Sequence, residues 1–302
     1  MRKIAMQRCC TTPVMLRQYE TSTDAVLRAL GAEPVDLEGF GCCGYPLKNF
    51  NLEAYLFSSA KNMSLAEKEG LDVLTFCNGC YGSLRRAKFF LRKNDELRNS
   101  ADKSLTEAGL SYRGGLEVKH LLHFLYRDIG KDSIRKKIDH PFDGLNIATH
   151  YGCQILRPWE EVGLNEQRSP VFFDELVEIT GAKSIEWTAK FDCCGAPVWG
   201  INNELSRLLL EKKILNALTA GADLFCVACP FCQLQFGHIQ RHLKEKGEID
   251  DTLPSILYTQ LLGLAMGLDE KVLGITKNRI DVSWISSRFQ HDEGEAACAM
   301  GL

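Results

Sequence analysis

The sequence lacks any hydrophobic segment long enough to cross a lipid bilayer. Its longest apolar stretch, Leu261 to Leu268, is far shorter than the roughly 20 residues that a transmembrane helix needs. The first residues, Met1 to Ala5, include two basic side chains, but no apolar run follows them, so a signal peptide is not expected. We therefore expect a cytoplasmic protein with no membrane span.

A strong excess of charge of one sign is also missing. The 36 Lys and Arg residues nearly balance the 39 Asp and Glu residues, which leaves a net charge of −3. This balance argues against a dedicated surface for nucleic acid or for an anionic membrane. The sequence contains neither a Gly-x-Gly-x-x-Gly nor a Walker-type loop, so no flavin, nicotinamide or nucleotide is expected on this chain.

Cysteine, in contrast, is abundant, and most of it follows a pattern that occurs twice. The segment Cys42-Cys43-Gly44-Tyr45-Pro46 returns as Cys193-Cys194-Gly195-Ala196-Pro197. Each pair has a lone cysteine upstream and a Cys-x-x-Cys motif downstream. Between the pair and that motif lie 33 residues in the first copy and 34 in the second. Repetition at this fidelity predicts a duplicated unit and two lobes.

The thirteen cysteines are better explained as metal ligands than as disulfides. Disulfide frameworks belong mainly to small secreted domains, whereas paired cysteines in a large chain without an export signal are typical of metal or redox sites. A zinc ion or a cubane cluster takes four ligands, and each copy offers five. The two predicted ligand sets are Cys10, Cys42, Cys43, Cys77 and Cys80, and Cys153, Cys193, Cys194, Cys229 and Cys232.

Three further cysteines lie outside these sets. Cys9 competes with Cys10 for the place of the first ligand, and the cysteine pattern alone does not decide between them. Cys226 lies in an apolar segment and is interpreted as a small core residue. Cys298 lies in a charged tail that begins at Arg288, and we interpret it as a spare thiol.

Each half of the chain alternates predicted strands and helices. The expected strands are residues 3–7, 34–37 and 71–76, then 146–150, 184–187 and 223–227. The expected helices are residues 21–30, 51–70 and 83–93, then 171–180, 204–218 and 233–246. This alternation favours an α/β fold with two pseudo-symmetric, Rossmann-like lobes, each a short parallel sheet flanked by helices. Right-handed crossovers would bring every cysteine motif to the carboxyl edge of a sheet, where ligands bind.

We expect four parts in the chain. Residues 1–100 form the first lobe, residues 101–145 a helical connector, residues 146–250 the second lobe, and residues 251–302 a C-terminal helix, expected over residues 254–268, and a tail. In the connector, residues 118–129 are predicted to form a helix that packs over the lobe junction. His120 and His123 in that stretch are interpreted as ordinary surface or hydrogen-bonded histidines rather than metal ligands.

The doubled pattern, Cys…Cys-Cys-Gly…Cys-x-x-Cys, resembles the signature of the heterodisulfide reductase B subunits. The resemblance extends through almost the whole chain. It includes Leu37-Glu38-Gly39, Cys77-Asn78-Gly79-Cys80, His150-Tyr151-Gly152-Cys153, Arg157-Pro158 and Tyr258-Thr259-Gln260-Leu261-Leu262-Gly263. It favours Cys10 as the first ligand, because Pro13 follows three residues later. Cys9 stands where the family pattern leads us to expect glycine.

The resemblance implies two noncubane [4Fe-4S] clusters, one in each half and each held by the five cysteines of that half. These ten cysteines are therefore the implied catalytic, cofactor-binding and metal-binding residues. The resemblance further implies an oxidoreductase that cleaves a small-molecule disulfide, such as the CoM-S-S-CoB heterodisulfide of methanogenesis. Its implied partners are a ferredoxin-like C subunit and a flavin-containing A subunit of a heterodisulfide reductase complex.

The family's substrates are anionic, so basic residues near the motifs are candidates for substrate binding. Lys48, Arg157 and Lys190 lie within a few residues of the cysteine motifs. Each is equally well explained as a solvated surface charge.

Two other functions stay open at this stage. The first is an iron–sulfur electron-transfer subunit of a hydroxyacid oxidase or of a sulfur-oxidising heterodisulfide-reductase-like complex. The second is a zinc-stabilised scaffold without redox chemistry. The sequence does not identify the disulfide or the physiological direction of the reaction.

Overall fold

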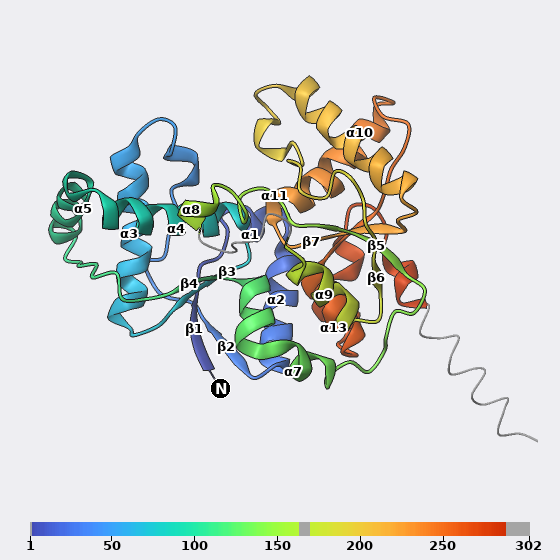
Figure 1. The fold of residues 1–302 in the computed structure, drawn as a ribbon, viewed down its shortest axis with the longest axis horizontal. Helices are drawn as coiled ribbons and strands as arrows, with labels where there is room; N and C mark the ends of the chain where they lie inside the picture. Colours follow the sequence, from blue (N-terminus) through green and yellow to red (C-terminus); the bar gives the residue numbers. More distant parts are fainter. Residues whose placement is uncertain (1, 163–169, 288–302) are drawn as a thin grey trace, which may run out of the picture.

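The computed structural model describes residues 2–162 and 170–287 and contains two four-stranded parallel sheets (Figure 1). The first sheet has the order β2-β1-β3-β4, and the second repeats it as β6-β5-β7-β8. The first four strands are β1 (Arg2–Met6), β2 (Ala32–Val35), β3 (Val73–Thr75) and β4 (Val118–His120). The second four are β5 (Asn146–His150), β6 (Lys183–Ser184), β7 (Leu224–Val227) and β8 (Ser255–Leu257). The predicted α/β fold with two similar lobes is confirmed.

The helices of the first lobe connect its strands in the expected order. They are α1 (Thr12–Met15), α2 (Arg17–Ala29), α3 (Leu52–Lys68), α4 (Asn78–Lys93) and α5 (Asp95–Glu107), with the short helix η1 (Tyr45–Leu47) before α3. The side chain of Asn51 accepts a hydrogen bond from the amide of Ala54 and so caps the start of α3. Helix α4 begins directly after Cys77, several residues earlier than predicted.

The second lobe has equivalent helices. They are α8 (Trp159–Val162), α9 (Phe172–Ile179), η3 (Ala196–Val198), α10 (Asn203–Thr219), α11 (Pro230–Gln233), η4 (Leu234–Ile239) and α12 (Gln240–Glu245). Asn202 caps α10 through the amide of Leu205, as Asn51 caps α3. Both asparagines stand eight residues after the second cysteine of their pair. The duplication therefore extends to the capping residues.

Two predicted helices begin instead as strands. Residues 118–129 form β4, followed by α6 (Leu121–His123) and η2 (Phe124–Gly130), with α7 (Lys131–Arg135) after them. Residues 254–268 form β8, followed by α13 (Tyr258–Ala265). Short apolar runs of this kind cannot be assigned by periodicity alone. The fourth strand of each sheet thus lies beyond the predicted lobe ends at residues 100 and 250, and the domain division itself stays a prediction.

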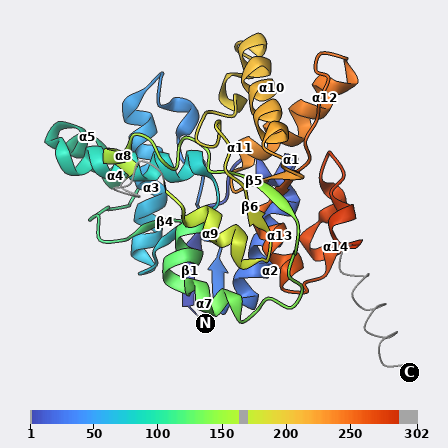
Figure 2. The ribbon, with the colours of Figure 1, turned by 45° about the vertical axis from the view of Figure 1, so that its right-hand side comes forward.

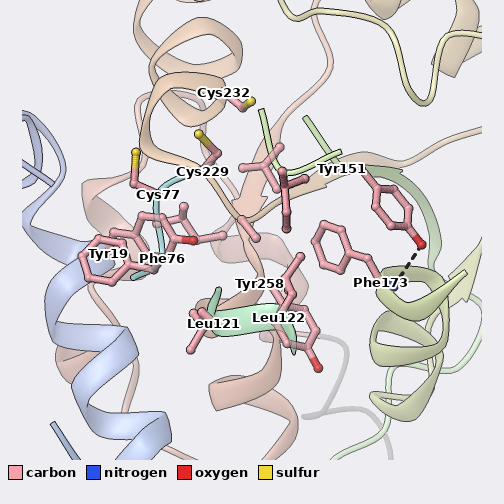
Figure 3. Close-up of a cluster of buried hydrophobic side chains, with 14 of the residues drawn as sticks. Tyr19, Phe76, Cys77, Leu121, Leu122, Tyr151, Phe173, Cys229, Cys232 and Tyr258 are labelled. Atoms are coloured by element: carbon pink, nitrogen blue, oxygen red, sulfur yellow. Dashed lines mark hydrogen bonds between the residues drawn. The ribbon is translucent and has the colours of Figure 1, made fainter. Parts of the chain in front are cut away.

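The two lobes share a hydrophobic core. Figure 2 shows α2 of the first lobe beside α13, and the hydroxyls of Ser22 and Thr259 are 2.7 Å apart across this contact. The last short helices are α14 (Glu270–Leu273), η5 (Ile275–Lys277) and η6 (Ser283–Ile285). In Figure 3, buried aromatic and leucine side chains of both lobes lie beneath Cys77, Cys229 and Cys232. The cysteines therefore rest on a base of buried side chains.

None of the helices in the described ranges is long and apolar enough to cross a membrane. The predicted tail from Arg288, with Cys298, lies outside the described residues.

Candidate metal centres

The upstream cysteines and the Cys-x-x-Cys motifs lie shortly after strands β1, β3, β5 and β7. Cys9 and Cys10 follow β1, and Cys77 follows β3, while Cys80 lies in the first turn of α4. The second lobe repeats this arrangement with Cys153 after β5 and Cys229 after β7. Because all strands of each sheet are parallel, their carboxyl ends meet at one edge. This geometry explains how cysteines far apart in the sequence come together.

In the first lobe the five predicted thiols and Cys9 form one continuous group. The sulfur atoms of Cys9, Cys77 and Cys80 all lie within 4.8 Å of one another, and all three residues are buried. Cys43 is hydrogen-bonded to Cys80 and to Cys42, and Cys42 is in turn hydrogen-bonded to Cys10. Cys10 and Cys42 lie on the exposed side of the group. We call these six thiols the first site.

In the second lobe the five predicted thiols also come together, and we call them the second site. Cys193 is hydrogen-bonded to Cys153 and Cys194, and Cys232 is hydrogen-bonded to Cys194 and Cys229. The contact between Cys153 and Cys193 repeats the one between Cys10 and Cys42.

The two sites touch. The thiols of Cys77 and Cys229 interact with each other across the lobe junction, and Figure 3 shows them side by side above the core. Asn78 Nδ2 donates to the backbone oxygen of Tyr151 at 2.8 Å, which ties the start of α4 to the loop that carries Cys153. Both sites therefore belong to one rigid centre.

Close packing of thiols separates their pKa values within each site. Hydrogen bonds from Cys153 and then Cys194 lower the pKa of Cys193 to about 2. The hydrogen bond with Cys193 raises the pKa of Cys194 to about 12. In the first site, hydrogen bonds from Cys42 and then Cys80 hold the pKa of Cys43 well below its ordinary value. A metal binds the thiolate form of cysteine, so its binding releases the protons that these thiols share.

Two buried residues at the second site, His150 and Lys213, were not predicted as site residues. A ring nitrogen of His150 and the sulfurs of Cys194 and Cys232 all lie within 4.8 Å of one another. Lys213 is fully buried, and its Nζ lies 3.3 Å from His150 Nδ1. Burial lowers the pKa of Lys213 to about 8, although the charges of Cys194 and Cys232 act in the opposite direction. The sequence did contain a sign of this burial. Lys213 lies three residues after Leu210 and four before Ala217, two buried residues of α10, and residues at this spacing share one face of a helix.

The three basic residues predicted near the substrate have different surroundings. Lys48 is half-buried, and its Nζ lies 4.5 Å from the centre of the Tyr45 ring. Arg157 is exposed and donates to the backbone oxygen of Phe191. Lys190 is buried, and it forms ion pairs with Asp174 at 2.7 Å and Glu186 at 3.0 Å. Its charge is already neutralised within the second lobe, so we retain only Lys48 and Arg157 as candidates.

The remaining predicted residues lie as follows. Cys226 is fully buried in the middle of β7, as expected for a small core residue. His120 and His123 are buried rather than at the surface, and His120 Nδ1 accepts from the amide of Leu122. Neither histidine is grouped with the cysteines of a site.

A small pocket lies between the lobes and opens toward the second site. The rings of Tyr45 and Phe231, one from each lobe, stand 5.9 Å apart at this pocket. Its lining residues are Tyr45, Asn78, Gly79, Cys153, Gln154, Cys194, Pro197, Cys229, Phe231 and Cys232.

The residues present fit a metal–sulfur group at each site. Each site presents at least five thiols, one more than a zinc ion or a cubane cluster takes. His150 Nε2 at the second site is buried without a hydrogen-bond partner, which suits a donor that faces the sulfurs of a bound group.

Comparisons with known proteins agree with this geometry. A family model described as the CCG cysteine-rich domain matches residues 4–85 and again residues 147–237. The chain is 41% identical over 299 residues to the B subunit of a ferredoxin/F420H2-dependent CoB–CoM heterodisulfide reductase of Methanosarcina acetivorans, with 97% of this chain and 99% of the relative covered. It is 39% identical to the B subunit of a ferredoxin:CoB–CoM heterodisulfide reductase of Methanosarcina mazei, with the same coverage.

Two more distant proteins are also similar to the chain. The 8-methylmenaquinol:fumarate reductase membrane anchor subunit of Wolinella succinogenes is 31% identical over 269 residues, which cover 88% of this chain and 93% of the relative. A solved structure of a hypothetical protein from Helicobacter pylori superposes with a TM-score of 0.73 at 19% identity, and covers 93% of this chain and 52% of that one. At that identity the likeness concerns the fold alone.

Proposed function

The chain belongs to the family of heterodisulfide reductase B subunits, and from this premise we propose that it is the disulfide-reducing subunit of a larger reductase complex. Its substrate is a small-molecule disulfide such as CoM-S-S-CoB. The reaction consumes two electrons and two protons, breaks the S–S bond and releases two thiols. The ten cysteines of the two sequence copies hold two noncubane [4Fe-4S] clusters in this proposal.

The observation that carries the proposal is the contact between two many-thiol sites at one pocket. Cys77 and Cys229 join the sites across the lobe junction, and residues of both lobes line the pocket. When bound, one cluster at each site would supply one-electron chemistry and a Lewis-acidic iron beside each sulfur of the disulfide. With two adjacent sites, each sulfur of the disulfide would have its own metal site, and each site would supply one of the two electrons of the reaction.

The chain's own residues would bind and orient the substrate. Tyr45 and Phe231 provide apolar walls at the pocket. Lys48 lies beside Tyr45 and interacts electrostatically with Cys153 of the other lobe, so its charge is placed to attract an anionic group at the pocket. Arg157 offers a second, exposed charge near Cys153.

Electrons would come from partner proteins, since the sequence contains no Gly-x-Gly-x-x-Gly or Walker-type loop for a flavin or a nucleotide. We propose a ferredoxin-like C subunit and a flavin-containing A subunit as these partners. The names of the two Methanosarcina relatives, which are B subunits of ferredoxin-linked reductases, support this proposal.

Metal analysis and a disulfide-reduction assay test the function together. Anaerobically prepared protein should be brown and contain about eight irons per chain. With a reduced viologen dye as electron donor, it should convert CoM-S-S-CoB to two thiols. A colourless protein with two zinc ions would reject the proposal. Iron-loaded protein that reduces no disulfide would instead identify an electron-transfer protein.

A further inference from the structure

The two sites differ at two equivalent positions beside the cysteines. His150 stands three residues before the first cysteine of its copy, and Gln7 has that place in the first copy. Lys213 stands nineteen residues after the second cysteine of its pair, as Asn62 does in the first copy. At both positions the first copy has a neutral amide side chain and the second copy has a nitrogen base. Both positions are next to the thiols of their site.

In the first copy the two amides bind the loop that carries the cysteine pair. Gln7 Nε2 donates to the backbone oxygen of Gly41 at 2.9 Å. Asn62 Nδ2 donates to the same oxygen at 3.0 Å and to that of Cys42 at 3.2 Å. The amide of Gly41 donates back to Asn62 Oδ1 at 2.9 Å. This part of the first site contains no formal positive charge.

In the second copy a buried cation takes the place of Asn62. Lys213 Nζ donates to the backbone oxygen of Ala189 at 2.5 Å and to His150 Nδ1 at 3.3 Å, and lies 4.9 Å from the centre of the Trp187 ring. No carboxylate in the described residues forms an ion pair with it. A buried charge without a counter-ion is costly. The largest favourable electrostatic interactions of Lys213 are with Cys194 and Cys232, followed by Asp192.

The contact with Lys213 also sets the tautomer of His150. His150 is buried, and its Nδ1 lies 3.3 Å from Nζ of Lys213. Because Nδ1 accepts from the ammonium of Lys213, the ring proton belongs on Nε2. Nε2 is buried without a partner, and the ring lies close to the sulfurs of Cys194 and Cys232. An N–H group is therefore available to donate to those sulfurs.

We propose that the Lys213–His150 pair makes the two sites electronically unequal, so that the second site holds an electron more readily than the first. This inference rests on the proposed function, because it concerns clusters held at both sites. A fixed positive charge and N–H donors to sulfur stabilise the more negative, reduced state of an iron–sulfur group. The first site, with Gln7 and Asn62, lacks that stabilisation. An electron that enters this centre would then settle first at the second site.

A redox titration followed by electron paramagnetic resonance tests this asymmetry. The signals of the two sites are assigned with Cys43→Ala and Cys194→Ala. In the wild-type chain the second site should have the higher reduction potential. Lys213→Met keeps the volume and removes the charge, and it should lower that potential by about 59 mV, a tenfold change in the one-electron equilibrium. The potential of the first site should not move.

Lys212→Met is the matched control, because Lys212 is the preceding residue, is exposed and pairs with Asp192. It should leave both potentials unchanged. The double variant His150→Gln/Lys213→Asn copies the pair of the first site and should bring the two potentials together. Lys213→Arg keeps the charge and should keep the difference.

Several results would overturn the inference. An unchanged second-site potential in Lys213→Met, or an equal shift at both sites, would show that the pair does not distinguish them. If the variants do not fold, the wild-type titration still decides, since equal potentials or a lower second potential contradict the inference. Wild-type protein without iron would reject the proposed function and this inference with it, whereas two clusters of equal potential would reject only the inference.

Discussion

Cys9 and Cys10 are neighbours in the chain, but their surroundings differ. Cys9 is buried against Cys77 and Cys80, and Cys10 is exposed beside Cys42. The equivalent of Cys10 is Cys153, which makes the same contact with its own cysteine pair. The equivalent of Cys9 is a glycine. The repeat therefore supports Cys10 as the ligand and Cys9 as an additional thiol of the first site.

Substitution of the two residues separates these roles. Cys9→Gly restores the Gly-Cys sequence of the second copy, and we expect it to retain the iron of the first site. Cys10→Ala should lose or alter that iron and leave the second site intact. Iron content and electron paramagnetic resonance spectra of the two variants check this prediction. Loss of the first-site signal in Cys9→Gly alone would assign the ligand to Cys9.

His123 provides a prediction about pH. Burial lowers its pKa to about 3, whereas a histidine in the unfolded chain titrates near 6.5. Between these values the unfolded chain binds one more proton than the folded chain. The free energy of unfolding should therefore fall as the pH drops below about 6.5, by about 1.4 kcal/mol per pH unit for this group.

Thermal unfolding from pH 7.5 to pH 5 checks this expectation. His123→Gln should lose part of the acid-side decrease in Tm, because the variant no longer carries that histidine. The exposed His242 serves as control, and His242→Gln should follow the wild-type curve. If His123→Gln also follows that curve, His123 does not contribute to acid sensitivity.

At the scale of elements, the loop after β5 has a glycine, Gly152, at the position where the equivalent loop after β1 has Cys9. Gly152 follows β5 with a φ of 77°, a conformation that glycine adopts readily. A Cβ atom there would clash with Nδ2 of Asn78, the atom that donates to Tyr151 across the lobe junction. The glycine thus permits the loop after β5 to approach Asn78 of the other lobe closely.

Gly152→Ala should weaken this junction and release iron from the second site. Gly31→Ala is a matched control, because Gly31 has a φ of 80° but no atom within 4 Å of the added Cβ. The control carries only the backbone cost, about 1–2 kcal/mol, and should keep both clusters. Tm and iron content of the two variants check the prediction. Equal losses in both would show that the contact with Asn78 is unimportant.

Much of this element order could be predicted, but the sheet edges could not. The parallel strands could be predicted from the alternation of strands and helices, and the cysteine sites from the spacing of the motifs that follow the strands. Both are local properties of the sequence. Strands β4 and β8 are only three residues long and run directly into helices, so their pairing with β3 and β7 depends on contacts that no local pattern records. Lys213 was missed for a related reason, since lysine is mostly exposed and only the tertiary structure places it beside His150.

The whole molecule brings two copies of one unit to a single centre. The thiols of each site come from one sequence copy, yet Cys77 and Cys229 interact across the junction, and both lobes line the pocket. Assembly of a site should therefore depend on its own lobe. Cleavage of a disulfide placed between the sites should depend on both lobes.

Three variants test this division. Cys43→Ala should disturb only the first site and Cys194→Ala only the second, as judged by iron content and electron paramagnetic resonance. Each single variant should abolish disulfide reduction, because one sulfur loses its partner site. The double variant should be no less active than either single one, since the effects of residues that act as a unit are not additive.

Cys226→Ala is the matched control, because Cys226 is buried in β7 outside both sites. This variant should retain iron and turnover. If Cys43→Ala lost its cluster but kept most of its turnover, catalysis would belong to the second site alone.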